Sequence, residues 1–107
     1  MTNRNNKVAR GIKELGAEFL SKENNKTSLI TVTGATCSND LKRATIYITV
    51  FPTIKEKSAL DFVQRQRHNF REFLKKNLPI KVIPFIEIAI DQGEKNRQKI
   101  DELLREK

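Results

Sequence analysis

Five residues whose side chains can bind phosphate recur at helical spacing in the second half of the chain. They are Arg65, His68, Arg71, Lys75 and Lys76. Steps of three and four residues place most of them on one face of a helix, opposite the apolar positions of the same segment. Lysine and arginine neutralise phosphates in contacts that are largely blind to sequence and weaken with salt. For any one residue a solvated helix face is the simpler interpretation, but the group indicates a surface that binds a polyanion.

The net charge of the 107-residue chain is +8, and the excess is concentrated in two segments. Residues 1–13 contain four basic and no acidic side chains, and residues 55–78 contain seven basic and three acidic ones, so each segment carries +4. Charges in the rest of the chain cancel. The first segment contributes Arg4, Lys7, Arg10 and Lys13. A charge that served only solubility would be spread more evenly, so the clustering favours a nucleic-acid partner.

The residue types that perform catalysis or bind metals do not form a recognisable site. One cysteine, Cys37, and one histidine, His68, are too few for a zinc site or an internal disulfide. A thiol nucleophile would need an activating base, so Cys37 is expected to be a small buried apolar residue. No Walker loop or dinucleotide-binding glycine pattern occurs. We therefore expect no catalysis, metal ion, cofactor or small-molecule substrate.

Length and hydropathy predict one domain over residues 1–107, with any disorder confined to the ends. No apolar run approaches the roughly 20 residues that cross a bilayer, and the first twenty residues lack the apolar core of a signal peptide. We therefore expect a cytoplasmic protein without membrane contact.

Two strands joined by a polar turn follow a first amphipathic helix. Val8, Ile12, Leu15 and Phe19 form one stripe of that helix, with basic residues on the other side. Residues 28–37 and 41–51 have the composition and alternation of strands, and the residues between them favour a hairpin turn.

A second helix is predicted to begin near Ser58, with Asp61 completing a capping-box-like pattern. On one continuous helix, Gln66 and Arg67 would fall inside the apolar arc. We therefore predict that the helix is interrupted near residues 65–69.

The C-terminal part predicts a third strand over residues 80–90, with Pro84 at an edge or bulge. A short helix after Gly93 then carries a weak apolar stripe of Ile100, Leu103 and Leu104. The fold class is α+β, with the element order helix, strand, strand, helix, strand, helix.

The chain resembles the ribosome-binding factor A family over nearly its whole length. The matching features are Arg4 with Lys7-Val8, then TVTGATCSNDLKRATIYITV (31–50), Phe70-Arg71 with Leu74, and IPFIEIAID (83–91). None of these motifs is specific alone, but their order and spacing together are. The family's Ala-x-Gly element, which interrupts its helix, would fall on Gln66-Arg67-His68 and is not kept here.

The resemblance implies a type II KH-like fold, a three-stranded sheet with helices packed on one face. It implies a monomeric, non-catalytic assembly factor that binds the free small (30S) ribosomal subunit or its precursor through 16S rRNA. The implied action is late maturation near the 5′ region of that rRNA, release before translation, and help with growth in the cold. The candidate RNA-binding residues are Arg4, Lys7, Arg10, Lys13, Lys42, Arg43, Arg65, Arg67, His68, Arg71, Lys75 and Lys76.

Two polar positions in the hairpin have competing interpretations. Asp40-Leu41 matches the family's hairpin signature, and a structural carboxylate that accepts backbone N–H groups is preferred over a catalytic acid. Tyr47 could stack on a base, but packing beneath a neighbouring helix is preferred. The six Phe residues are assigned mostly to the core.

Two other functions fit the same charge pattern: a module that docks an acidic protein, and a general RNA- or DNA-binding domain. Binding to free small subunits but not to translating ribosomes would favour the assembly factor. Replacement of Arg65, Arg71 and Lys75 by Glu is predicted to abolish subunit binding while leaving the fold intact.

Overall fold

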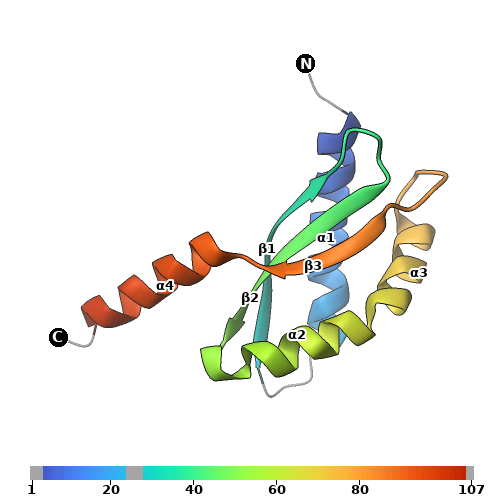
Figure 1. The fold of residues 1–107 in the computed structure, drawn as a ribbon. Helices are drawn as coiled ribbons and strands as arrows, with labels where there is room; N and C mark the ends of the chain where they lie inside the picture. The colour runs from blue at the N-terminus through green and yellow to red at the C-terminus, as the bar shows by residue number, and fades with distance from the viewer. Residues whose placement is uncertain (1–3, 24–27, 106–107) are drawn as a thin grey trace.

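The structure is a computed structural model that describes residues 4–23 and 28–105 (Figure 1). Its elements in chain order are α1 (Arg4–Glu23), β1 (Leu29–Cys37), β2 (Arg43–Phe51), the 3₁₀ turn η1 (Thr53–Lys55), α2 (Glu56–Arg65), α3 (Arg67–Asn77), β3 (Phe85–Ile90) and α4 (Gln92–Arg105). This is the α+β order predicted from the sequence, and the architecture is that of a type II KH-like domain.

The sheet has the order β1-β2-β3, so β3 is an edge strand. β1 and β2 pair antiparallel, from Leu29 opposite Phe51 to Cys37 opposite Ala44. β2 and β3 pair in parallel, from Arg43 opposite Phe85 to Ile48 opposite Ile90. The parallel pairing requires the chain to cross over from β2 to β3, and α2 and α3 make that crossover.

The core lies between one face of the sheet and the three helices α1, α2 and α3. Alternate residues of β2, which are Ala44, Ile46, Ile48 and Val50, are all buried in it together with residues of each of these helices. The predicted stripe of α1 also faces the core. Burial of one such aliphatic side chain contributes about 1.5–3 kcal/mol relative to exposure, so this face holds the helices in place.

A small residue lets α1 approach the end of α3 closely. A Cβ atom at Gly11 would lie 2.8 Å from Cδ1 of Leu78, closer than real Cβ contacts come. Leu78 is itself buried, so a larger side chain at residue 11 would force it to move.

The predicted interruption of the second helix is confirmed, at Gln66 between α2 and α3. Gln66 has φ −86° and ψ 1°, and its N–H donates to the carbonyl oxygens of Val63 (3.0 Å) and Phe62 (3.2 Å). The Gln66 carbonyl then accepts from the N–H of Phe70 (2.9 Å) at the start of α3. Because φ is negative, any L-residue can occupy the bend, which explains why no glycine is needed.

Two predicted boundaries are wrong. The third strand begins at Phe85 rather than at residue 80, because β2 begins at Arg43 and offers no partner for residues 80–84. The second helix begins at Glu56 rather than near Ser58, and the Ser58 hydroxyl donates to the Lys55 carbonyl (3.0 Å) instead of capping. Asp61 therefore takes no part in a capping box.

α4 leaves the end of β3 and projects away from the helices that cover the sheet (Figure 1). Its first turn is anchored by Asp91, which accepts hydrogen bonds from the Thr33 hydroxyl (2.5 Å) and the Glu94 N–H (3.0 Å). Lys95 also pairs with Glu56 at 3.1 Å. The predicted apolar stripe of Ile100, Leu103 and Leu104 is exposed. None of the described helices is long and apolar enough to cross a membrane.

Candidate nucleic-acid interface

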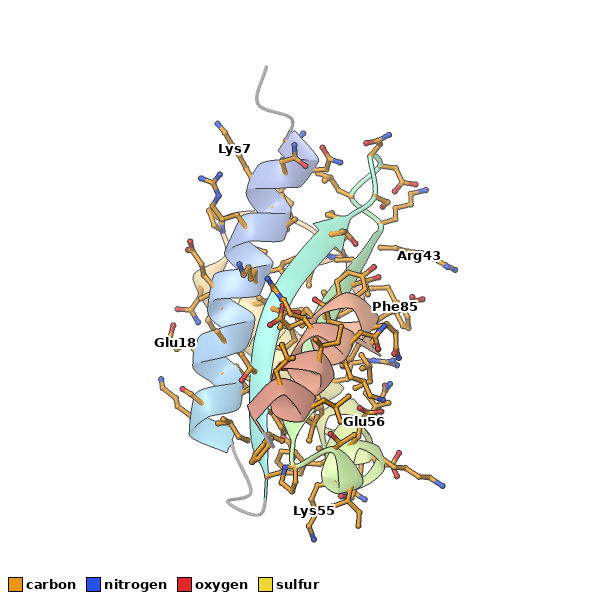
Figure 2. All side chains as sticks on the ribbon, turned by 90° about the vertical axis from the view of Figure 1, so that its left-hand side faces the viewer. Lys7, Glu18, Arg43, Lys55, Glu56 and Phe85 are labelled. Carbon is orange, nitrogen blue, oxygen red and sulfur yellow. The ribbon has the colours of Figure 1, made fainter. Side chains whose placement is uncertain are left out.

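The basic residues of α1 lie on its outer side. Arg4, Lys7, Arg10 and Lys13 are all exposed, and Figure 2 shows Lys7 directed away from the sheet. Arg43 projects on the opposite side of the molecule in the same view. The structure therefore does not bring all twelve candidate residues onto one continuous surface.

The bend divides the second group of basic residues. Arg65 ends α2, whereas Arg67, His68, Arg71, Lys75 and Lys76 belong to α3. Arg65, His68, Lys75 and Lys76 are exposed, while Arg67 and Arg71 are half-buried. The basic face that was predicted along the second helix is mainly a property of α3.

A hollow of about 220 Å³ lies between α3 and the edge strand β3. It is lined by Arg67, His68, Arg71, Phe85 and Ile86, and we call it the edge groove. Three of its five lining residues are candidates from the sequence.

The edge groove combines an aromatic ring with a guanidinium group. The guanidinium carbon of Arg67 lies 4.9 Å from the centroid of the Phe85 ring, within the range of a cation–π contact. Arg67 also donates to the side-chain oxygen of Gln64 at 3.0 Å, but its buried Nε has no partner among the described residues. The ring itself remains 48% exposed. An exposed ring beside cations suits a nucleotide, whose base can stack while its phosphate is neutralised.

Internal ion pairs engage only two of the candidate residues within the described parts of the chain. Lys75 pairs with Glu72 at 3.1 Å, and Arg43 pairs with Glu87 at 3.9 Å. The hydrogen bond from Lys75 lowers the pKa of Glu72. All four side chains are largely exposed, so these pairs are weak competitors for a polyanion.

Asp40 has the structural role predicted for it in the hairpin turn. Its Oδ1 accepts hydrogen bonds from the Ser38 hydroxyl (2.6 Å) and the Lys42 N–H (3.0 Å), and these bonds lower the pKa of the Asp40 carboxyl. Leu41 adopts a positive φ of 61° and packs against the core. The turn closes with a 2.8 Å bond from the Ser38 N–H to the Arg43 carbonyl. A carboxylate occupied in this way holds the turn rather than transferring protons.

The other groups that could act as a nucleophile or bind a metal ion are Cys37 and the His, Asp and Glu side chains. Cys37 is half-buried rather than fully buried, and burial, followed by the charge of Asp40, raises the pKa of its thiol. A raised pKa disfavours the nucleophilic thiolate. In the described part of the chain, no three His, Cys, Asp or Glu residues are grouped so that they could hold a metal ion.

Tyr47 is half-buried, opposite Gly34 of β1 and Ala89 of β3. By strand alternation it lies on the face of the sheet that α1, α2 and α3 leave uncovered. Packing beneath a neighbouring helix was the preferred interpretation, and α1, α2 and α3 do not provide that helix. The ring next to the basic residues is that of Phe85.

Phe85 was missed because the phenylalanines were assigned to the core as a group. The alternation of side chains along this strand could have identified Phe85 as exposed. Ile86, Ile88 and Ile90 point to the core, so Phe85 must point away from it. Lys81 was also missed. It lies in the loop between α3 and β3, and only the tertiary structure shows that it lines a second hollow together with Lys42.

A sequence model of one family, described as ribosome-binding factor A, matches residues 4–104. The chain belongs to the ribosome-binding factor A family. It is 34% identical to ribosome-binding factor A of Paenarthrobacter aurescens over 103 residues, covering 94% of this chain and 62% of that protein. It is 31% identical to the protein of Geobacter metallireducens, covering 99% and 92%. The chain thus spans about three fifths of the length of the first relative and nearly all of the second.

Solved structures from the same family share the fold. The crystal structure of ribosome-binding factor A from Thermus thermophilus matches with a TM-score of 0.73 and 20% identity, covering 80% of this chain and 93% of that one. A solution structure from Thermotoga maritima, named a putative ribosome binding factor A, matches with a TM-score of 0.67 and 27% identity, covering 79% and 84%. A homology model of the Thermus thermophilus protein, fitted into a cryo-EM map of a 30S complex, matches with a TM-score of 0.59 and 19% identity, covering 81% and 91%.

Proposed function

We propose that this protein is a non-catalytic assembly factor that binds the free small ribosomal subunit, or a precursor of it, through 16S rRNA. Family membership supports a ribosomal partner, and the 30S complex of the Thermus thermophilus neighbour supports the small subunit. The net charge of +8 supports contact with RNA rather than with an acidic surface patch alone.

The observation that carries the proposal is the edge groove. The Arg67 guanidinium lies over one face of the Phe85 ring, and His68 and Arg71 line the same hollow. This arrangement holds an unpaired nucleotide by stacking and phosphate contact, which positions the RNA without breaking a bond. The wider role includes 16S rRNA maturation, cytoplasmic location, action as a monomer and help with growth in the cold.

Sedimentation through sucrose gradients tests the proposal. The protein should travel with free small subunits and with their precursors, and should stay at the top of gradients that contain only translating 70S ribosomes. Equal recovery with 70S ribosomes would contradict it. Capture of one acidic protein that survives ribonuclease treatment would instead favour a protein-docking module, and equal affinity for arbitrary RNA and DNA duplexes would favour a general nucleic-acid binder.

A further inference from the structure

A second, larger hollow lies at the hairpin end of the molecule. Its volume is about 620 Å³, within the range of roughly 300–1,000 Å³ typical of ligand sites. It is lined by Arg4, Asp40, Leu41, Lys42, Pro79, Ile80, Lys81 and Val82. These residues come from three segments that meet at one end of the fold: the start of α1, the turn between β1 and β2, and the loop between α3 and β3 (Figure 1).

Each of the three segments contributes one exposed cation to this hollow. Arg4, Lys42 and Lys81 have no ion-pair partner within the described ranges 4–23 and 28–105. The one acidic lining residue, Asp40, already accepts hydrogen bonds from Ser38 and from the Lys42 backbone. Asp40 keeps its negative charge and interacts with Lys42, so the hollow holds three cations against one anion. The remaining net charge of +2 attracts an external anion.

Between these cations the lining is apolar. Leu41 and Ile80 are half-buried and Val82 is 73% exposed, so together they give the hollow an accessible apolar surface. An apolar surface bordered by cations matches a nucleotide with an unpaired base, which has a flat apolar face and a phosphate. A duplex fits less well, because its bases are stacked inside and only its phosphates could make contact.

Hydrogen bonds hold the three segments together. The side-chain amide of Asn5 in α1 donates to the Cys37 carbonyl (3.2 Å) and to the Asn39 side chain (3.0 Å) in the hairpin. The N–H of Phe85, which ends the loop, donates to the Lys42 carbonyl (2.8 Å). The cations are thus attached to a preformed frame, which reduces the ordering cost of binding.

We propose that this hairpin-end hollow is a second contact for single-stranded RNA, distinct from the edge groove. The inference rests on the proposed function, because it takes RNA as the ligand. Lys42 and Lys81 neutralise phosphates while the base lies against Leu41, Ile80 and Val82. Two contacts on one small domain allow it to hold two unpaired RNA segments at a fixed relative position.

Two-dimensional ¹H–¹⁵N NMR of the full chain measures the amide chemical shifts at both hollows in one experiment. The probe is a six-nucleotide single-stranded RNA, followed through the amides of Leu41, Lys42 and Lys81 for the hairpin end and of His68 and Ile86 for the edge groove. Both sets should shift in the wild type. The variant K42E/K81E should weaken binding at the hairpin end by about tenfold or more while the edge-groove shifts persist. The charge-matched variant K55E/K57E, altered at two exposed residues that line neither hollow, should bind like the wild type.

The outcomes separate this inference from the proposed function. Shifts at the edge groove without shifts at the hairpin end would overturn the second contact and leave the proposed function standing. No shift at either site would overturn both. Equal shifts with an RNA duplex, or with hexaglutamate, would show that the hollow recognises charge alone, and would also overturn the assignment of a nucleotide.

Discussion

Arg67, the first residue of α3, covers one side of the Phe85 ring on the edge strand, with 4.9 Å between the guanidinium carbon and the ring centroid. The helix bend at Gln66 directly precedes this arginine. In a straight helix the Arg67 side chain would point toward the apolar core of the protein. The bend directs it to the edge of the sheet instead, where it lines the edge groove beside Phe85.

Replacement of Phe85 by Ala should weaken binding of single-stranded RNA by about 1–3 kcal/mol, or roughly 5- to 150-fold, because a stacking surface is lost. Fluorescence anisotropy with a labelled oligonucleotide measures the change. Phe51 provides the matched control, since it is also a strand phenylalanine and is 58% exposed. Phe51→Ala should bind normally, and an equal loss in both variants would argue against a specific role for Phe85.

Affinity for small subunits should fall steeply with salt, because phosphate contacts release counterions. If about five phosphates are contacted, the logarithm of the association constant should fall against the logarithm of salt concentration with a slope of about −3.5 to −4.5. Titrations at several potassium chloride concentrations give the slope. A slope close to zero would be inconsistent with binding through the rRNA backbone.

Replacement of Gly34 in β1 by a β-branched residue is expected to stabilise the protein. A Cβ atom there would meet no atom within 4 Å, and the φ of Gly34 is not positive. Gly34→Val should raise the free energy of unfolding by about 0.5–1 kcal/mol, through strand propensity and a cross-strand contact with Tyr47. Urea denaturation followed by circular dichroism tests this, and a loss of stability would show that the bulge at residues 32–34 requires glycine.

Asp91 should make the stability of the protein sensitive to acid. Hydrogen bonds from the Thr33 hydroxyl and then from the Glu94 N–H lower the pKa of its carboxyl below the ordinary value of 3.8. Because the folded pKa lies below the unfolded one, this contribution is complete above the unfolded value and is lost as pH falls through the folded value. Asp91→Ala should therefore lower the melting temperature at neutral pH, and the difference from the wild type should shrink below pH 3.8.

Asp61 serves as the control for that experiment, since it is exposed and has no hydrogen-bond partner among the described residues. Asp61→Ala should leave the melting temperature almost unchanged at both pH values. A pH-independent effect of Asp91→Ala would mean that packing of the Asp91 side chain, rather than its negative charge, anchors α4.

The sequence revealed those features that depend on local pattern. The mismatch of Gln66 and Arg67 with the apolar arc correctly located the bend, and the alternation of β2 correctly identified its buried face. The start of β3 could not be found in this way. Residues 80–84 are as apolar as a strand, and only the register with β2 determines that pairing begins at Phe85.

The grooves are likewise products of tertiary structure. Lys81 lines the same hollow as Lys42 because the loop after α3 returns to the hairpin, although the two residues are distant in sequence. Arg67 and Phe85 are brought together by the parallel pairing of β3 with β2. Charge clustering predicted that the basic residues bind a nucleic acid. It could not show that they are divided between two hollows and the outer face of α1.

Binding of charge-reversed variants to free small subunits tests the central claim most directly. The variant R65E/R71E/K75E alters the basic residues at and beside the edge groove. The variant K22E/K55E/K57E makes the same change in net charge elsewhere, and each variant disrupts one exposed helical ion pair, Lys75–Glu72 or Lys22–Glu18. Both variants should melt like the wild type by circular dichroism. Loss of co-sedimentation in the first with retention in the second is predicted, whereas equal binding of the two would contradict recognition of rRNA through this surface.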